Sequence, residues 1–453
     1  MSPLLLDELR RQWPPAEPPE PPESAVGAGY TLIPLDGLRL LDACELLGTD
    51  GQQDRLVVAV AGDEADRLVL APLVEAAGRW RRARPGDGLS RALVEAFGGR
   101  GKLAGGFRLL PLAETPPLGD ARERAIGVDQ TNTSVAVGDA VVVKWLQLPE
   151  PGERRAATLL AHLAAVGFDA VPRPFGSLSW TDPDGREATI ALADAYLPDA
   201  RDGWDWCVAR LEAHLQHEDG PCPPDCGAWI GAPLGRLVAG LHVALALPSD
   251  VIPEPMARAT PKHVDHWRAA ALAMFEEATK AQATERGAEL GALASPIRNV
   301  LATLTTETGT PVQPIHGDLH VGQVLEWRDG LAIIDFDGNP TLGAGMNAAL
   351  QPAARDVAQM TTSLDHVGRV VAERVEGAQV ARVGSWIAET TAAFLAAYVA
   401  GLESVGRREL FDEALLAPFE VEQECRELVY AARFLPRWRY APMSALRARF
   451  RGR

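Results

Sequence analysis

The segment from Gln313 to Pro340, QPIHGDLHVGQVLEWRDGLAIIDFDGNP, constrains the fold of this chain more than any other segment. It predicts an irregular loop followed by a β-hairpin, because an apolar run from Leu331 to Ile334 stands directly before a second acidic pair. The polar side chains of the segment are His316, Asp318, His320, Gln323, Asp335 and Asp337. The fold is therefore expected to bring acidic groups from the loop and from the end of the hairpin to one site.

The order of these side chains is typical of phosphoryl transfer. A hydroxyl that attacks the terminal phosphoryl group of a nucleotide needs a nearby carboxylate to orient it and accept its proton, which suits Asp318. The amide oxygen of Gln323 is a hard neutral ligand for Mg²⁺, and the carboxylate of Asp335 can bridge Mg²⁺ to phosphates. Asp337 is predicted to lie on the same side of an extended segment as Asp335 and to reach a second ion.

The two histidines of the loop have different expected roles. His316 is predicted to be structural and to hold the loop through hydrogen bonds. His320 lies two residues beyond Asp318 and is a candidate to face the substrate. Each acidic segment alone also fits an ordinary turn, with Gly317 at positive φ and Asp318 capping a neighbour. Both together, after an upstream lysine on an apolar strand, favour catalysis.

These motifs resemble those of the aminoglycoside-phosphotransferase-like kinases. HGDLHxxQ followed by DFDGNP carries the resemblance, and glutamine in place of asparagine looks like the actinobacterial maltokinase and glucosamine kinase branch. Further matching segments are QTNTSV (130–135), the strand that ends at Lys144, DGW (202–204), LGRLVAGLH (234–242) and RDV (355–357). The resemblance implies a two-lobed, protein-kinase-like α+β fold with an N-terminal cap, and ATP with Mg²⁺ as phosphoryl donor.

Three regions follow from the pattern and the resemblance. Residues 1–108 are predicted to form the cap, 109–198 a small lobe that binds ATP, and 199–453 a mostly helical lobe with the catalytic loop and sugar pocket. In the cap, strands are expected at 31–34, 55–61 and 67–74, and a helix at 90–97. In the large lobe, helices are expected at 204–216, 229–246, 264–284, 289–305, 353–372, 381–405 and 419–434.

The predicted ATP-binding residues lie in the small lobe, where strands at 133–137 and 140–145 meet at a Gly-Asp turn. The loop that runs into the first strand is expected to cover the phosphates with Thr131, Asn132, Thr133 and Ser134. Lys144 is expected to reach the α- and β-phosphates, with Glu153 on the following helix as its partner. Without the downstream loop, an ordinary turn and a surface lysine would explain both features.

The helix expected at 419–434 indicates the acceptor. Glu420, Glu424 and Glu427 fall within about 60° of one another on a helical wheel, with Gln423 beside them. Trp438 follows and is expected to stack on a sugar ring or an ammonium group. The alternatives are a solvated acidic face paired with nearby arginines, and core packing of the tryptophan. Three carboxylates and an amide suit an amino sugar.

The resemblance to the glucosamine kinase branch agrees with this interpretation and implies phosphorylation of D-glucosamine to glucosamine 6-phosphate. The position of the hydroxyl comes from the resemblance alone. Three alternatives stay open: a maltokinase that makes maltose 1-phosphate, an aminoglycoside phosphotransferase, and a catalytically inactive, nucleotide-binding regulatory pseudokinase. Retention of Lys144, Asp318, Gln323 and Asp335 together argues against the inactive alternative.

Composition narrows the setting. A formal net charge of −17 over 453 residues argues against nucleic-acid binding and favours a cationic substrate. The chain has no run of about 18 apolar residues and no signal-peptide pattern, so we expect a cytoplasmic protein without a membrane span. Five cysteines in a chain of this length fit a reducing compartment. The sequence allows either a monomer or a dimer.

One cysteine and histidine cluster stands apart from these motifs. His214, His217, Cys222 and Cys226 occur as HxxHxxxxCPPDC, which is close enough in sequence for a Zn²⁺ site. The spacing of the cysteines is irregular for such a site, and an inert loop or a local disulfide is the simpler interpretation.

Overall fold

The computed structural model describes residues 3–16, 33–47, 54–65, 67–99, 103–126, 132–152, 154–217, 226–282, 287–304, 309–339 and 349–451. The predictions for Thr131, Glu153 and Cys222 concern residues outside these ranges and stay predictions. Within the described residues the chain forms two compact units. The first takes in Met1–Ala164 and Pro172–Asp199, and the second Ala165–Val171, Ala200–Leu342 and Asn347–Arg453.

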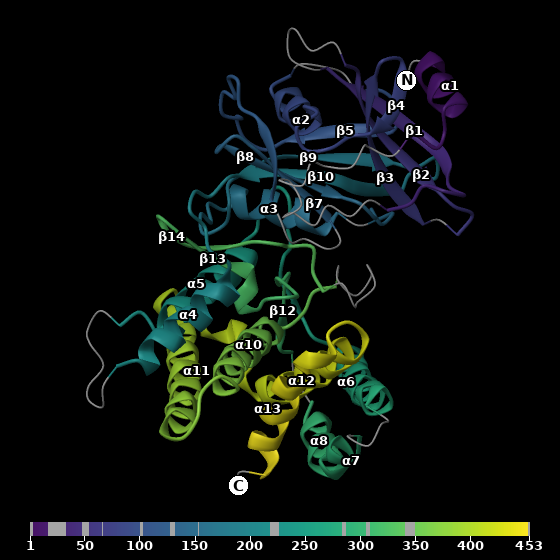
Figure 1. The fold of residues 1–453 in the computed structure, drawn as a ribbon. Coiled ribbons are helices and arrows are strands. Elements are labelled where there is room, and N and C mark those ends of the chain that lie inside the picture. The colour runs from purple at the N-terminus through teal and green to yellow at the C-terminus, as the bar shows by residue number, and fades with distance from the viewer. Residues whose placement is uncertain are drawn as a thin grey trace. The chain divides into compact units, whose positions relative to one another are not determined.

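The first unit contains two antiparallel sheets (Figure 1). The four-stranded sheet runs in the order β1 (Arg39–Leu46), β2 (Leu56–Gly62), β3 (Leu68–Ala76), β4 (Arg79–Arg82). The six-stranded sheet runs in the order β5 (Phe107–Pro111), β9 (Pro174–Thr181), β10 (Glu187–Ala195), β8 (Val141–Leu146), β7 (Asn132–Val137), β6 (Glu123–Ile126). The helices of this unit are α1 (Pro3–Arg11), α2 (Leu89–Phe97) and α3 (Arg155–Ala165).

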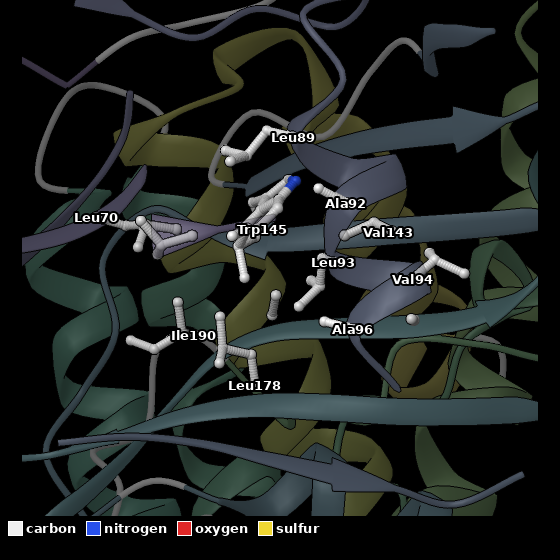
Figure 2. Packing of buried hydrophobic residues seen from close by; sticks show 14 of the residues in the cluster. Leu70, Leu89, Ala92, Leu93, Val94, Ala96, Val143, Trp145, Leu178 and Ile190 are labelled. Atoms are coloured by element: carbon white, nitrogen blue, oxygen red, sulfur yellow. The ribbon is translucent and has the colours of Figure 1, made fainter. Parts of the chain in front are cut away.

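One hydrophobic core joins the two sheets. Figure 2 shows side chains of α2 directed toward Leu70 of β3, Trp145 of β8 and Ile190 of β10. The Trp145 indole donates a hydrogen bond of 3.0 Å to Ser90 Oγ, so its single polar atom is satisfied inside the core. Burial of this apolar surface stabilises the unit by about 25 cal/mol per Å². A second core lies under α1, where Leu9 packs with residues of the four-stranded sheet.

The strands expected at 55–61 and 67–74 and the helix at 90–97 are confirmed as β2, β3 and α2. The strand expected at 31–34 is wrong in its described part, since residues 33–35 form no strand. The sequence pattern missed β1, in which a register shift between Leu40 and Asp42 interrupts the alternation of apolar and polar residues. Asp42 is half-buried, and its carboxylate accepts hydrogen bonds from Gly106 N and Trp180 Nε1, which offset the cost of burying it.

The residues expected to bind ATP occupy two neighbouring strands of the six-stranded sheet. The pair β7 and β8 is confirmed, and Gly138 between them has a φ of 58°. Ser134 of β7 lies opposite Lys144 of β8 in the register. The structure begins β7 at Asn132, so Asn132, Thr133 and Ser134 are strand residues and not part of a loop. The Thr133 hydroxyl accepts a hydrogen bond of 2.8 Å from Gln147 Nε2.

The second unit is mostly helical. Its α-helices are α4 (Gly203–Leu215), α5 (Gly231–Leu245), α6 (Pro261–Ala281), α7 (Gly287–Ala292), α8 (Ala294–Ala302), α10 (Ala354–Ala372), α11 (Ala378–Ser404), α12 (Leu416–Arg433) and α13 (Tyr440–Arg451). Short 3₁₀ helices are η2 (Val321–Gln323), η3 (Arg408–Leu410), η4 (Glu413–Leu415) and η5 (Pro436–Arg439). Strand β11 (Ala257–Arg258) pairs with β12 (Pro311–Val312), and β13 (Val324–Trp327) forms the expected hairpin with β14 (Gly330–Ile333).

Helix α10 is central to this unit and packs against α4, α11, α12 and α13 (Figure 1). Helices α5 and α11 approach closely at Gly235, which has no side chain. A Cβ at this position would lie 2.3 Å from the carbonyl oxygen of Phe394. The helix expected at 289–305 is divided into α7 and α8 around Leu293. Helix α13 was not among the helices expected from the sequence. Pro442 lies in its first turn, where no amide donor is required.

By length and composition, α11 could cross a membrane, and 28% of its most apolar window is buried. Within this unit it packs along α5 and against α4 and α10. Its apolar residues Val383, Trp386, Phe394 and Tyr398 are buried there.

Candidate phosphoryl-transfer site

The predicted catalytic loop lies between β12 and η2 in the second unit. Gly317 adopts a φ of 86°, which places Asp318 at the tip of a tight turn. His316 is structural, as expected. Its Nε2 lies 2.9 Å from the Ile334 carbonyl oxygen, and its Nδ1 accepts from the Asp318 amide at 3.3 Å. The imidazole thus ties the loop to the residue that precedes Asp335.

The buried carboxylate of Asp356 binds the backbone of the catalytic loop. Asp356 accepts hydrogen bonds from the amides of His316 at 2.6 Å and Gly317 at 2.8 Å. Its Oδ2 also lies 3.2 Å from His242 Nε2. Burial raises the pKa of Asp356, but the contacts with His242, His316 and the Gly317 amide outweigh burial and hold the pKa below its ordinary value. The RDV and LGRLVAGLH motifs therefore meet at this carboxylate.

Two further side chains of α10 complete this support, and the sequence analysis missed both. Gln359 accepts from the Leu319 amide and donates to the Gly317 carbonyl, each at 2.9 Å. The Ser363 hydroxyl accepts from the Val321 amide at 3.1 Å. Together with Asp356 they stand at i, i+3 and i+7 on one face of the helix. Polar residues at helical spacing after the RDV motif were the signal that could have identified them.

The DGW motif positions the same loop from another direction. The Asp202 carboxylate caps α4 by accepting from the Trp204 amide at 2.8 Å. A Cβ on Gly203 would lie 1.7 Å from the carbonyl oxygen of Val321, so only glycine lets α4 begin against η2. Trp206, one turn further, donates from its indole to the Val324 carbonyl oxygen at 3.1 Å.

The structure brings together the two main candidates for metal binding. Gln323 ends η2, and its side-chain amide lies 3.4 Å from Asp335 Oδ2. Rotation of the amide group would direct its oxygen beside the carboxylate, and such hard oxygen donors suit Mg²⁺. Asp335 is exposed and has a φ of 66°, an uncommon conformation for a residue with a side chain.

The prediction that Asp337 continues an extended segment after Asp335 is wrong. The positive φ of Asp335 and a turn at Phe336 and Asp337 replace the extended conformation. The rule that alternate residues share one side of a strand therefore does not apply here. Asp337 is half-buried, and its role as a ligand for a second ion stays a prediction.

Asp318 is the carboxylate at the centre of the loop, and its side chain is 21% exposed. Its Oδ1 accepts from Asn339 Nδ2 at 3.0 Å, and its Oδ2 lies 3.9 Å from His320 Nε2. Burial raises the pKa of Asp318 to about 6, with further contributions from Asp335 and Glu427. A carboxylate tuned in this way is a better proton acceptor than one in water.

We expect the catalytic efficiency to rise with pH through about 6 and then to level off, because the predicted role of Asp318 as proton acceptor requires its deprotonated form. The kcat/KM profile of the purified enzyme checks this expectation. In the Glu427→Gln variant the inflection should move to lower pH, since loss of one neighbouring negative charge lowers the pKa of Asp318. A profile without an inflection on the acidic side would contradict this role of Asp318.

His320 also shapes the loop. Its Nδ1 accepts from the Gly322 amide at 3.1 Å and so caps η2, while its Nε2 lies 3.4 Å from the Gln323 amide nitrogen. The ring is 43% exposed. This position lies between Asp318 and Gln323, so the ring is available to a molecule that contacts both.

Helix α12 divides its predicted acidic edge between two environments. Glu427 is half-buried and contributes to the electrostatic field at Asp318. Its two carboxylate oxygens accept from Gln423 Nε2 and from Trp438 Nε1, each at 3.1 Å. Trp438 in turn packs edge-on against Trp204, with ring centroids 5.2 Å apart. These four side chains form a polar and aromatic group beside the catalytic loop.

The other two glutamates of the edge contact partners within the protein. Glu420 accepts from Thr361 Oγ1 and pairs with Arg449 of α13, each at 2.8 Å. Glu424 is buried, and its Oε2 lies 2.9 Å from His366 Nε2. Burial lowers the pKa of His366, but Glu424 and Glu427 outweigh it and raise the pKa to about 9. Burial also raises the pKa of Glu424, to about 7, so the contact favours a proton shared within the His366 and Glu424 pair.

Two pockets reflect this division. Glu420 and Glu424 line a pocket with Asp365 and Arg449. Gln423 lines a different and smaller pocket, whose walls are Gly317, Asn339, Arg355, Gln359, Phe419, Glu422, Gln423 and Arg426. The smaller pocket adjoins the catalytic loop. Within this lining, Glu422 pairs with Arg355 at 3.1 Å and with Arg426 at 3.0 Å.

Comparisons with known proteins found similar kinases, although no family model matches the chain. A glucosamine kinase from Streptacidiphilus jiangxiensis is 40% identical over 417 residues, which covers 90% of this chain and 91% of that protein. A glucosamine kinase from Mycolicibacterium smegmatis is 39% identical over 397 residues, with 87% and 95% covered. A solved glucosamine kinase in complex with glucosamine, ADP and inorganic phosphate is 36% identical, with a TM-score of 0.77 and 99% and 100% covered.

The fold and the site define a small-molecule kinase of α+β architecture, as the sequence predicted. A catalytic-loop carboxylate, a following amide and a carboxylate at the end of a hairpin are the parts that this class requires. The chain belongs to the glucosamine kinase family.

Proposed function

We propose that this protein transfers the γ-phosphoryl group of ATP to the 6-hydroxyl of D-glucosamine. The observation that carries the proposal is the placement of Glu427, Gln423 and Trp438 beside the Asp318 loop in a chain that is 40% identical to a glucosamine kinase. The solved relative in complex with glucosamine, ADP and inorganic phosphate supports both the acceptor and the nucleotide.

In this mechanism Asp318 accepts the proton of the attacking hydroxyl, and Asn339 orients the carboxylate by donating to its Oδ1. His320 and Trp438 border the sugar, and the Glu427 carboxylate attracts its ammonium group. Gln323 and Asp335 are the residues that would hold Mg²⁺, which neutralises charge on the phosphates when it is bound. Lys144 is the proposed cation for the α- and β-phosphates.

Within the acidic edge, we assign the contact with the ammonium group to Glu427 and a supporting role to Glu424. Glu424 holds His366, whose ring packs edge-on against Trp438 with centroids 5.5 Å apart. The pair thus fixes one wall of the proposed sugar site. A cytoplasmic location and either a monomeric or a dimeric state stay predictions from the sequence.

The decisive assay follows ADP release with Mg-ATP and a panel of glucosamine, N-acetylglucosamine, glucose, maltose and kanamycin. We expect glucosamine to have the highest kcat/KM, because only kanamycin shares its positive charge and kanamycin is much larger. Turnover of glucose equal to that of glucosamine would refute recognition of the amine. Preference for maltose would indicate a maltokinase, and preference for kanamycin an aminoglycoside phosphotransferase. No turnover of any acceptor would favour a catalytically inactive regulatory pseudokinase.

Replacing Glu427 with Gln should raise the KM for glucosamine about 10- to 100-fold and leave the KM for ATP unchanged, since a charged hydrogen bond is worth about 1.5–3 kcal/mol. Steady-state kinetics with each substrate varied in turn provide the measurement. Glu277→Gln is the matched control: it removes one carboxylate that pairs with Arg433 at the surface. Equal changes in both KM values would place Glu427 outside the acceptor site.

A further inference from the structure

A group of potential metal ligands lies in the second unit outside the phosphoryl-transfer site. His214 is in the last turn of α4, His217 follows the end of that helix, and Cys226 precedes α5. One ligand atom from each of the three residues can be chosen such that all lie within 4.8 Å of one another. All three side chains are half-buried, so a bound ion would be shielded from solvent without being inaccessible.

The spacing of these atoms fits zinc. In a tetrahedral site with a Zn–S bond of about 2.3 Å and a Zn–N bond of about 2.05 Å, sulfur and nitrogen lie about 3.6 Å apart. The distance from Cys226 Sγ to His214 Nδ1 is 3.6 Å. The two imidazoles face each other edge-on, with centroids 5.5 Å apart. Small rotations of their side chains bring a nitrogen of each to a common ion.

The backbone around this group is held by contacts from α11. Arg382 donates hydrogen bonds to the carbonyl oxygens of His214, Leu215 and His217, at 3.0 to 3.2 Å. On the other side of the group, the Trp386 indole donates to the Ala228 carbonyl oxygen at 2.9 Å. The two segments that carry the ligands are therefore held in place before any ion binds, which reduces the entropic cost of coordination.

The chemistry of the donors selects the ion. A thiolate and two neutral imidazoles are soft and borderline ligands that favour Zn²⁺, whereas the oxygen donors at Gln323 and Asp335 favour Mg²⁺. Binding would release the thiol proton of Cys226, and these three residues would supply three of the four ligands of a tetrahedral ion. The HxxH spacing places both imidazoles within one turn at the end of a helix, where the His217 amide still bonds to the His214 carbonyl oxygen at 3.2 Å.

We propose that His214, His217 and Cys226 bind one Zn²⁺ ion that fastens the end of α4 to the segment before α5. The ion has a structural role. It cross-links the two ends of the connection between these helices, and α4 in turn supports the catalytic loop through Gly203 and Trp206. None of these ligands belongs to the phosphoryl-transfer site, so the zinc proposal does not depend on which sugar the protein phosphorylates.

The test measures zinc directly in the full-length protein. Protein purified with a reductant and stoichiometric ZnCl₂, then dialysed, should retain about one zinc per chain by elemental analysis. The variants His214→Ala and Cys226→Ser should each retain much less, while His266→Ala, a change at an exposed histidine outside the group, should retain as much as the parent protein. Equal zinc content in the parent and the two ligand variants would overturn the proposal.

A second measurement guards against variants that fail to fold. Chelation of zinc from the parent protein should lower its Tm, and addition of ZnCl₂, but not MgCl₂, should restore it. Substitution with Co²⁺ should give the absorption of a thiolate bound to cobalt, which the Cys226→Ser variant should lack. A parent protein that binds no zinc, or one in which Cys226 is found in a disulfide under the same reducing conditions, would refute the site.

Discussion

Replacing Asp318 with Asn should lower kcat by about two to four orders of magnitude, the range expected for loss of a general base. The asparagine oxygen can still accept from Asn339, so the loop keeps its shape and the KM for ATP should change little. The variant should also be at least as stable as the parent protein at pH 7. Burial disfavours the charged carboxylate, as its raised pKa shows.

The measurement is steady-state turnover of glucosamine together with thermal unfolding of both proteins. Asp329→Asn is a suitable control, because it removes an exposed carboxylate from the turn of the adjoining hairpin. A kcat within a factor of about ten of the parent value would mean that another group accepts the proton. A large drop in Tm would show that the loss of activity is a folding defect.

The second large effect is expected from Asp356→Ala, which should lower the free energy of unfolding by about 3–5 kcal/mol. The change removes the acceptor for the amides of His316 and Gly317 and leaves both buried without that partner. It also removes the contact with His242. Because the same amides define the catalytic loop, kcat should fall even under conditions in which the variant is fully folded.

Urea unfolding, followed by tryptophan fluorescence, measures the stability. Asp365→Ala on the same helix is the control, since its partially exposed ion pair with Arg369 should contribute about 1 kcal/mol or less. Similar losses in the two variants would contradict the special position of Asp356. A stable Asp356→Ala variant with normal kcat would show that Gln359 and Ser363 hold the loop without it.

The sequence predicted those parts of the site whose signals are local. Gly317 before Asp318 and the turn at Gly138 each act on residues a few positions away. Their physical effect is therefore visible in a short window of sequence. The hairpin that leads to Asp335 was predictable for the same reason, because an apolar run and turn residues specify it.

The conformation of Asp335 was not predictable from such a window. A residue with a side chain rarely adopts a φ of 66°, so local preference favoured the extended segment that the structure contradicts. The surrounding hydrogen bonds, including that of His316 to the Ile334 carbonyl oxygen, come from the tertiary fold. Gln359 and Ser363 were missed for a related reason, since their partners lie about 40 residues away in the chain.

The acidic edge of α12 shows both the strength and the limit of a helical wheel. Periodicity grouped Glu420, Glu424 and Glu427 on one face. It could not reveal that Arg449 reaches Glu420, because α13, which carries this arginine, was itself not expected. Because helix α13 was not expected, the partner of Glu420 on α12 was not expected either.

The interior that α2 shares with both sheets has a consequence for engineering of this enzyme. The predicted cap supplies Leu70, Leu89 and Leu93, which cover Val143 and Trp145 on β8. Lys144, the proposed phosphate contact, lies between these two residues. Removal of residues 1–108 would expose Val143 and Trp145 to water, at a cost of about 1.5–3 kcal/mol per large side chain. The first hundred residues therefore cannot be treated as a detachable module.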